Sequence, residues 1–136
     1  MPITYTIDPE QRRINAFATG IINAQDLHGL VRSLLADPAL VPGMRGLYNS
    51  SYAEPDITIL QLAEVAGEVR QLLNRGLARI AIVSGSVTTY RVAKTFTVLA
   101  RAIGIDVDVF TELAAAEAWL AEDDDMSRSD EMMLPR

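Results

Sequence analysis

The chain opens with two short segments in which apolar and polar residues alternate. The alternation runs over residues 3–7 and again over residues 14–20, and residues Asp8 to Arg12 between the two segments are typical of a turn. A period of two places successive side chains on opposite faces of a strand. The sequence therefore predicts a β-hairpin at the start of the chain.

Two longer segments that follow have apolar residues at helical spacing. The first comes after Asn23 and Asp26, which resemble a capping box, and stops at Asp37-Pro38. The second is expected to begin after a cap at Asp56 and to end at Gly76. Both are predicted to be amphipathic helices with one face in the core.

Two further helices are predicted in the second half of the chain. One covers residues 87–103 and ends at Gly104. The other is expected from a cap at Thr111 through Leu120, with Leu113 packed inward and Trp119 over the rim of the core.

Three strands are predicted between these helices. Residues 45–50 form a short strand that is followed by a polar loop over residues 51–55. Residues 78–84 are apolar on both faces, which favours the central strand of a covered sheet. Residues 105–109 are apolar on one side only, so that strand is expected near an edge.

The element order predicts an α/β fold. Its order is β-β-α-β-α-β-α-β-α, and the connections suit a mixed, mostly parallel five-stranded sheet with an antiparallel N-terminal strand. The one-sided edge strand further indicates that helices cover one face of the sheet more fully than the other. A partly bare face offers a surface for a homodimer.

Composition narrows the class of protein. The 136 residues are 49% hydrophobic, contain no cysteine and hold no apolar run that could span a bilayer, so we expect one cytoplasmic domain over residues 1–121 with no membrane span. Residues 122–136 form an acidic tail, in which six carboxylates against two arginines account for −4 of the net charge of −6. The remaining body is nearly neutral, which gives no reason to expect nucleic acid as a partner. The apolar cluster at residues 132–135 is a second candidate for contact with a neighbouring subunit.

The pattern and order of these segments resemble the SpoIIAA-like, or STAS, superfamily of anti-sigma-factor antagonists, and in particular its small stand-alone bacterial branch. The residues that carry the resemblance are the hairpin Ile3 to Glu10, the helix start Gly20 to Asp26 with Ala36-Asp37-Pro38 at its end, the strand Arg79 to Val83 and the closing segment Val107 to Leu120. The resemblance implies a SpoIIAA-like fold and a binding or switching module in place of an enzyme.

A phosphorylation site is also part of what the resemblance implies. In the superfamily a Ser or Thr in an Asp-Ser-Ser-Gly type motif accepts the phosphate, and the matching stretch here is Asp56-Ile57-Thr58-Ile59. Thr58 is the candidate acceptor, although the neighbouring Ser and the Gly are missing. A phosphate at this position would lie near a helix N-terminus, where backbone N–H groups favour anions.

Hydroxyl-rich segments after the third and fourth strands are the candidate ligand site. Ligands of open α/β sheets gather at the carboxyl ends of strands, and a helix N-terminus beside an arginine suits a phosphate or carboxylate. The simpler alternative is that these hydroxyls cap a helix and the arginine faces water. The candidate residues are Asn49, Ser50, Ser51, Tyr52, Ser84, Ser86, Thr88, Tyr90 and Arg91.

No catalytic constellation is evident. The single histidine, His28, is predicted to face away from the apolar stripe of the first helix, so no Ser-His-acid triad can be assembled. We expect no metal and no cofactor. The sequence favours a non-enzymatic regulatory or protein-binding module; the alternatives are a small anionic or acyl-ligand-binding protein that uses the hydroxyl-rich loops, and an uncharacterised enzyme.

Overall fold

Five strands and four helices make up residues 2–122, the part of the chain that the computed structural model describes. In chain order they are β1 (Ile3–Asp8), β2 (Arg13–Asn23), α1 (Ala24–Ala36), β3 (Arg45–Asp56), α2 (Ile59–Asn74), β4 (Arg79–Ser84), α3 (Val87–Ala102), β5 (Val107–Phe110) and α4 (Leu113–Leu120). The acidic tail from residue 123 onward lies outside the described residues.

The strands form one sheet in the order β1-β2-β3-β4-β5. β1 pairs with β2 in antiparallel fashion and the other pairs are parallel, which confirms the predicted fold class and the edge position of β5. The prediction that residues 78–84 form the central strand is wrong, because β3 occupies the centre. β4 lies one strand from the edge and is apolar on both sides because helices cover both of its faces.

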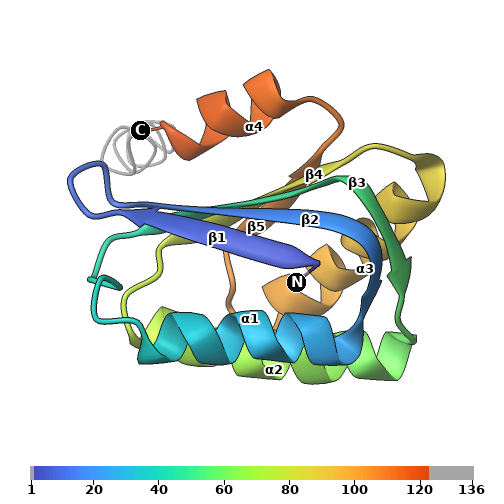
Figure 1. The fold of residues 1–136 in the computed structure, drawn as a ribbon, viewed down its shortest axis with the longest axis horizontal. Coiled ribbons are helices and arrows are strands. Elements are labelled where there is room, and N and C mark those ends of the chain that lie inside the picture. The colour runs from blue at the N-terminus through green and yellow to red at the C-terminus, as the bar shows by residue number, and fades with distance from the viewer. Residues whose placement is uncertain (1, 123–136) are drawn as a thin grey trace, which may run out of the picture.

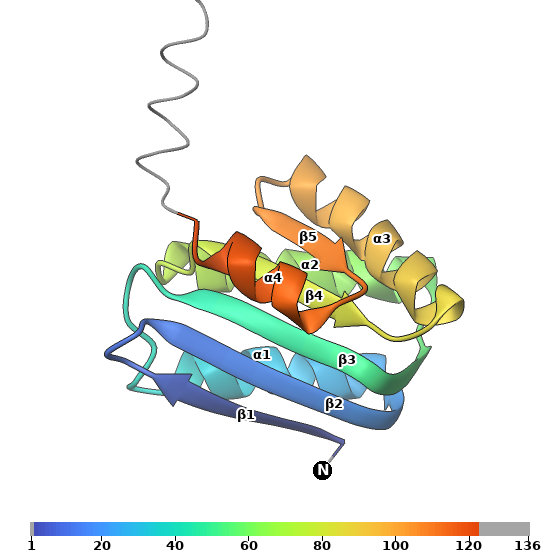
Figure 2. The same cartoon turned by 90° about the horizontal axis from the view of Figure 1, so that it is seen from above.

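Helices lie on both sides of the sheet, but unequally. Figure 1 shows α1, α2 and α3 on one face and α4 on the other. Seen from above, α4 lies over β3 and β4, while no helix of residues 2–122 covers β1 and β2 on that face (Figure 2). The expectation of unequal coverage is confirmed. None of the helices in this range is long and apolar enough to cross a membrane.

The main hydrophobic core lies between the sheet and the first three helices. A smaller apolar cluster joins α4 to the other face, where Ala116 and Leu120 are buried beside Trp119. The expectation that Leu113 packs inward is wrong, because its side chain is exposed at the first residue of the short helix.

Two of the three predictions of an N-terminal helix cap are wrong. The capping box of Asn23 with Asp26 is confirmed at the start of α1. However, Asp56 is still paired within the sheet, and α2 begins instead with a reciprocal capping box between Thr58 and Gln61. Glu112 occupies the N-cap position of α4 in place of Thr111 and makes no side-chain cap bond.

The prediction of a polar loop over residues 51–55 is also wrong, because β3 continues to Asp56. The long end of β3 pairs with an equally extended β2, with a register shift between Phe17 and Thr19. Buried Ala53 from β3 and Ile22 from β2 share a small apolar cluster there. This packing outweighs the weak strand propensity of the polar residues around it.

Candidate functional site

The structure brings some of the predicted hydroxyl groups together at the carboxyl end of the sheet. Ser50 and Ser84 are paired in the register of β3 and β4, and both are buried. The Ser50 hydroxyl donates to the carbonyl of Val83 at 2.6 Å, and the Thr89 hydroxyl donates to the carbonyl of Ala53 at 3.2 Å. These hydrogen bonds tie β3 to β4 and to α3, so both donors are already used within the fold.

Ser86 and Gly85 shape the connection from β4 to α3. The Ser86 hydroxyl caps α3 by accepting from the backbone N–H of Thr89 at 3.1 Å. Gly85 passes so close to β3 that a Cβ on it would overlap the carbonyl group of Ser51. Only glycine fits this crossing, which fixes where α3 begins.

The other predicted ligand residues lie on different surfaces. Asn49 lies on the face of the sheet next to α4, and the Tyr52 ring lies beside Phe17 on that same face. Ser50 lies on the opposite face. Thr88 and Arg91 are exposed on α3, and Tyr90 is half-buried against the main core. Binding of a ligand by these residues stays a prediction.

Thr58 is exposed at the N-cap of α2. Its hydroxyl accepts from the backbone N–H of Gln61 at 3.2 Å, and the Gln61 side chain accepts from the backbone N–H of Thr58 at 2.9 Å. A phosphate on Thr58 would stand at the N-terminus of a helix of four turns, where it is electrostatically favoured. Phosphorylation of Thr58 stays a prediction as well.

The structure gives His28 a partner that the sequence did not predict. Its Nδ1 contacts a carboxylate oxygen of Glu68, so the pair joins α1 to α2 and both side chains are largely buried. Since α2 lies alongside α1, the flank of the α1 stripe faces a helix and not water. Within residues 2–122 no cluster of three or more histidines and carboxylates could hold a metal ion.

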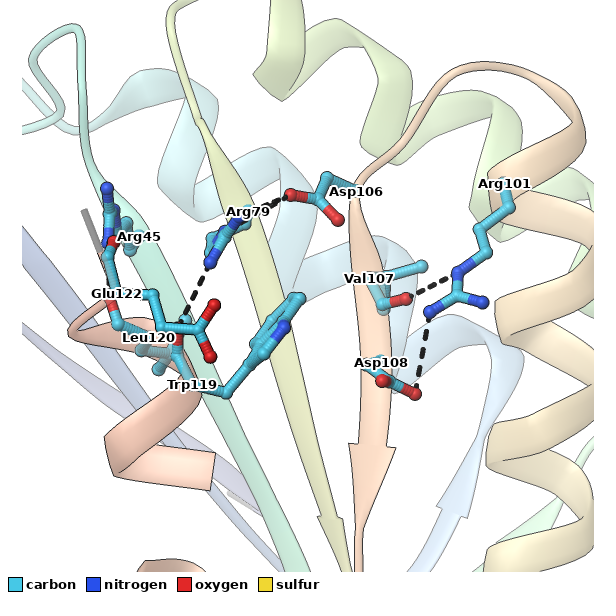
Figure 3. A network of polar contacts seen from close by, with 9 residues as sticks. All are labelled: Arg45, Arg79, Arg101, Asp106, Val107, Asp108, Trp119, Leu120 and Glu122. Carbon is cyan, nitrogen blue, oxygen red and sulfur yellow. Dashed lines mark hydrogen bonds and ion pairs between the residues drawn. The ribbon is translucent and has the colours of Figure 1, made fainter. Parts of the chain in front are cut away.

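A polar network near α4 was not predicted from the sequence (Figure 3). Arg79 at the start of β4 is buried, pairs with the carboxylate of Asp106 at 3.1 Å and donates to the carbonyl of Trp119 at 3.0 Å. Its guanidinium also lies 4.5 Å from the centre of the Trp119 ring. The sequence signal was an arginine at the start of an otherwise apolar strand.

Two further arginines complete this network. Arg45 donates to the carbonyls of Leu120 and Glu122 at the end of α4, and Arg101 of α3 donates to the carbonyl of Val107 at 2.9 Å. All of these contacts join elements of the fold. The contacts of Arg45 and Arg79 hold the end of α4 on the sheet, and the contact of Arg101 joins α3 to β5.

The uncovered part of the sheet forms a shallow groove beside α4. The groove has a volume of about 540 Å³ and its lining includes Thr4, Thr6, Asn15, Phe17, Asn49 and Leu113. Phe17 is 39% exposed and Tyr52 is 74% exposed, and the two rings lie 6.1 Å apart. Ile21, further along β2, is 67% exposed. We call the surface of Phe17, Ile21 and Tyr52 with this groove the open face.

A second hollow lies on the opposite side of the sheet. It is a cavity of about 150 Å³ between the sheet and α1, α2 and α3, and its lining includes Val65, Leu72 and Phe96. Nothing in the spacing of these residues distinguishes them from an ordinary core.

Comparison with known proteins bears on the fold. No model of a known protein family matches the chain, and no curated protein matches it. Among solved structures, it is similar to an uncharacterised protein of the DUF3478 family with a SpoIIAA-like fold from Shewanella loihica PV-4, with a TM-score of 0.57 and 16% sequence identity over 88% of this chain and 94% of the other. Together with the strand order and the helix arrangement, this similarity shows that the chain has a SpoIIAA-like fold.

Proposed function

We propose that this protein is a non-enzymatic regulatory or protein-binding module that binds a protein partner through its open face. The observation that carries the proposal is the exposed aromatic pair of Phe17 and Tyr52 on a sheet surface that α4 leaves uncovered. Exposed aromatic side chains on a flat, rigid scaffold are the residues that most often anchor protein interfaces.

The chemistry around this pair supports a protein partner. The polar part of the groove lining consists mainly of neutral hydroxyl and amide groups, such as Thr6, Asn15 and Asn49. Its charged lining residues are Arg13 and Glu117, which pair with each other. A surface with aromatic anchors and compensated charges resembles the core and rim of a protein interface. It offers no row of cations for a nucleic-acid backbone.

The partner's complementary surface is expected to be apolar at its centre. Phe17, Ile21 and Tyr52 present rings and a branched aliphatic chain, which favour aliphatic or aromatic side chains in contact. Regulation is proposed to act at Thr58, because its hydroxyl is exposed and stands at the N-terminus of α2. The absence of enzymatic activity is part of the same proposal.

Site-specific photocrosslinking tests where the partner binds. A photoreactive residue in place of exposed Thr19 on β2 should form a crosslink to one partner in cells, while the same residue in place of exposed Lys94 on α3 should not. The captured protein is then purified and its affinity measured by calorimetry.

The matched variants are Phe17→Ser with Tyr52→Ser on the open face and Val98→Ser on α3, where Val98 is as exposed as Ile21. We expect the double variant to weaken binding by at least about 30-fold, because each anchor contributes about 1 kcal/mol or more. Val98→Ser should leave the affinity unchanged. Equal affinities of all three proteins, or a homodimer in place of a heterologous complex, would overturn the proposal.

A further inference from the structure

The two edges of the sheet differ in how their backbone groups are satisfied. At β5, the Arg101 guanidinium donates to the carbonyl of Val107 at 2.9 Å. The Asp108 carboxylate accepts from the backbone N–H of Val109 at 2.8 Å. Side chains therefore occupy backbone groups that a further strand would need. At the other edge, no segment of residues 2–122 lies beyond β1 (Figure 2), and an uncovered edge of this kind is a template for pairing with another strand.

The register of β1 shows which of its backbone groups point outward. The N–H of Thr19 donates to the carbonyl of Pro2 at 2.9 Å, so these two residues form a hydrogen-bonded pair that continues the register of β1 with β2. Hydrogen-bonded pairs alternate with non-hydrogen-bonded pairs in an antiparallel ladder, so Thr4 and Thr6 bond to β2. The residues that turn their N–H and C=O groups away from β2 are Ile3, Tyr5 and Ile7, and these groups have no hydrogen-bond partner within residues 2–122.

The sequence of this edge is a palindrome. Ile3-Thr4-Tyr5-Thr6-Ile7 reads the same in both directions about Tyr5. A two-fold axis that passes through Tyr5, perpendicular to the sheet, places a second copy of β1 antiparallel to the first. Each residue then faces a residue of its own type in the other copy, which is the self-complementarity that a two-fold interface requires. The pairs are Ile3 with Ile7, Thr4 with Thr6 and Tyr5 with Tyr5, and β-branched and aromatic pairs of this kind stabilise antiparallel strands.

The same register also satisfies the backbone of both copies. It sets the outward-facing Ile3, Tyr5 and Ile7 of one copy against Ile7, Tyr5 and Ile3 of the other as hydrogen-bonded pairs. A shift by two residues leaves one of the three without a partner, and a shift by one residue sets them against residues that already bond to β2. Residues 3–7 contain no charge and no proline, which are devices that natural edge strands use against such pairing.

We propose that the edge of β1 is an interaction surface for a second copy of this chain, which pairs with it antiparallel about Tyr5 and joins the two sheets into one. The open face stays uncovered in this arrangement, so the pairing does not depend on the proposed partner. The two open faces become neighbours between the two α4 helices. The Cα atoms of Phe17 in the two copies lie about 16 Å apart, three strand spacings across the sheet and two residues along it.

The helices leave room for the second copy. α1 contacts both β1 and β2, and the Tyr5 hydroxyl donates to the carboxylate of Asp37 at the end of α1 at 2.9 Å. A helix placed above these two strands lies about two strand spacings, or about 10 Å, from its two-fold mate, which is an ordinary distance between packed helices. The α1 helices therefore add side-chain contact to the strand pairing.

Amide hydrogen exchange of the wild-type chain tests the pairing directly. At protein concentrations above the dimer Kd, the backbone amides of Ile3, Tyr5 and Ile7 should exchange at least about tenfold more slowly than at concentrations far below it, because a strand then covers them. The amides of Thr4 and Thr6 already bond to β2 and should change much less. The amides of β5, at the other edge, serve as the control and should not change with concentration.

Charged residues at Thr4 and Thr6 test the register. Both side chains are exposed, and in the dimer each Thr4 faces Thr6 of the other copy. Thr4→Lys with Thr6→Lys sets like charges opposite each other twice and should raise the dimer Kd, measured by analytical ultracentrifugation, at least about tenfold. The matched control, Thr4→Lys with Thr6→Glu, sets opposite charges across from each other and should dimerise at least as well as the wild type.

Three results would contradict the pairing. The proposal is overturned if the full chain stays monomeric up to about 1 mM. It is also overturned if the dimer forms but the lysine pair and the lysine and glutamate pair give the same Kd, with no concentration-dependent protection of the amides of β1. A dimer that is insensitive to these charges and dissociates in Phe17→Ser with Tyr52→Ser would place the contact on the open face instead of the edge.

Discussion

Replacement of Gly46 by alanine tests directly whether the space beneath β3 is empty. Gly46 is buried, lies in the middle of the sheet and lines the cavity. A Cβ built on its backbone has one neighbouring heavy atom within 4 Å, the Cδ1 of Leu77 at 4.0 Å. The added methyl group therefore meets ordinary van der Waals contact and displaces nothing.

The expected gain in stability follows from two contributions. Burial of one methyl group stabilises the fold by about 0.8 kcal/mol. Replacement of glycine by alanine at an unstrained position adds about 0.4–1 kcal/mol, because the unfolded chain loses conformational freedom. The free energy of unfolding should therefore rise by about 1–2 kcal/mol, which raises the Tm of a domain of this size by roughly 5 °C.

Urea denaturation and calorimetry of the two proteins measure the change. The midpoint should rise while the m-value stays the same, since the surface exposed on unfolding hardly changes. A Tm that is equal to or lower than that of the wild type would refute the reasoning, because it would mean that side chains already fill the space next to Gly46.

Three other changes have expected outcomes. Gly85→Ala should lower the free energy of unfolding by at least about 2 kcal/mol in urea, because its Cβ would overlap the backbone of Ser51; an unchanged midpoint would contradict the close crossing. Because the pKa of Tyr48 is raised in the folded chain, its phenol keeps its proton at alkaline pH values where the unfolded chain loses it. The contribution of Tyr48 to the free energy of unfolding is therefore complete below about pH 10 and falls by about 1.4 kcal/mol per pH unit above that value. Tyr48→Phe should flatten that decline, and equal slopes in the two proteins would refute the assignment. Arg79→Lys should lower the free energy of unfolding by about 2 kcal/mol and shift the fluorescence emission of Trp119, the single tryptophan, to the red. The reason is that a lysine cannot both pair with the carboxylate of Asp106 and stack on the Trp119 ring. Unchanged emission would show that α4 is held by other contacts.

Much of the fold was predictable from local patterns. The alternation over residues 3–7 and 14–20 predicted the hairpin, and the positions of Asn23, Gly76 and Gly104 marked helix ends that the structure contains. These signals are local, because strand alternation, capping and positive φ depend on residues a few positions apart. The order of strands and helices then limited the topology to a mixed, mostly parallel sheet.

Errors arose where a distant segment decided the outcome. The end of β3 looked like a polar loop, yet pairing with β2 extends it to Asp56 and moves the cap of α2 to Thr58. His28 was predicted to face away from the apolar stripe of its helix, with no partner indicated, and α2 supplies Glu68 beside it. In each case the missing information was a partner far away in the chain, which no local pattern contains.

The sequence by itself determined the elements, their order and the apolar composition of the core. The pattern also indicated that one face of the sheet is less covered than the other. Only the tertiary structure decided that β1 and β2 are the uncovered strands and that a hollow of about 150 Å³ remains beside Gly46, Val65 and Phe96. The physical reason is that a hydrophobic pattern specifies which side chains turn inward, whereas the space they leave depends on the distances between packed elements.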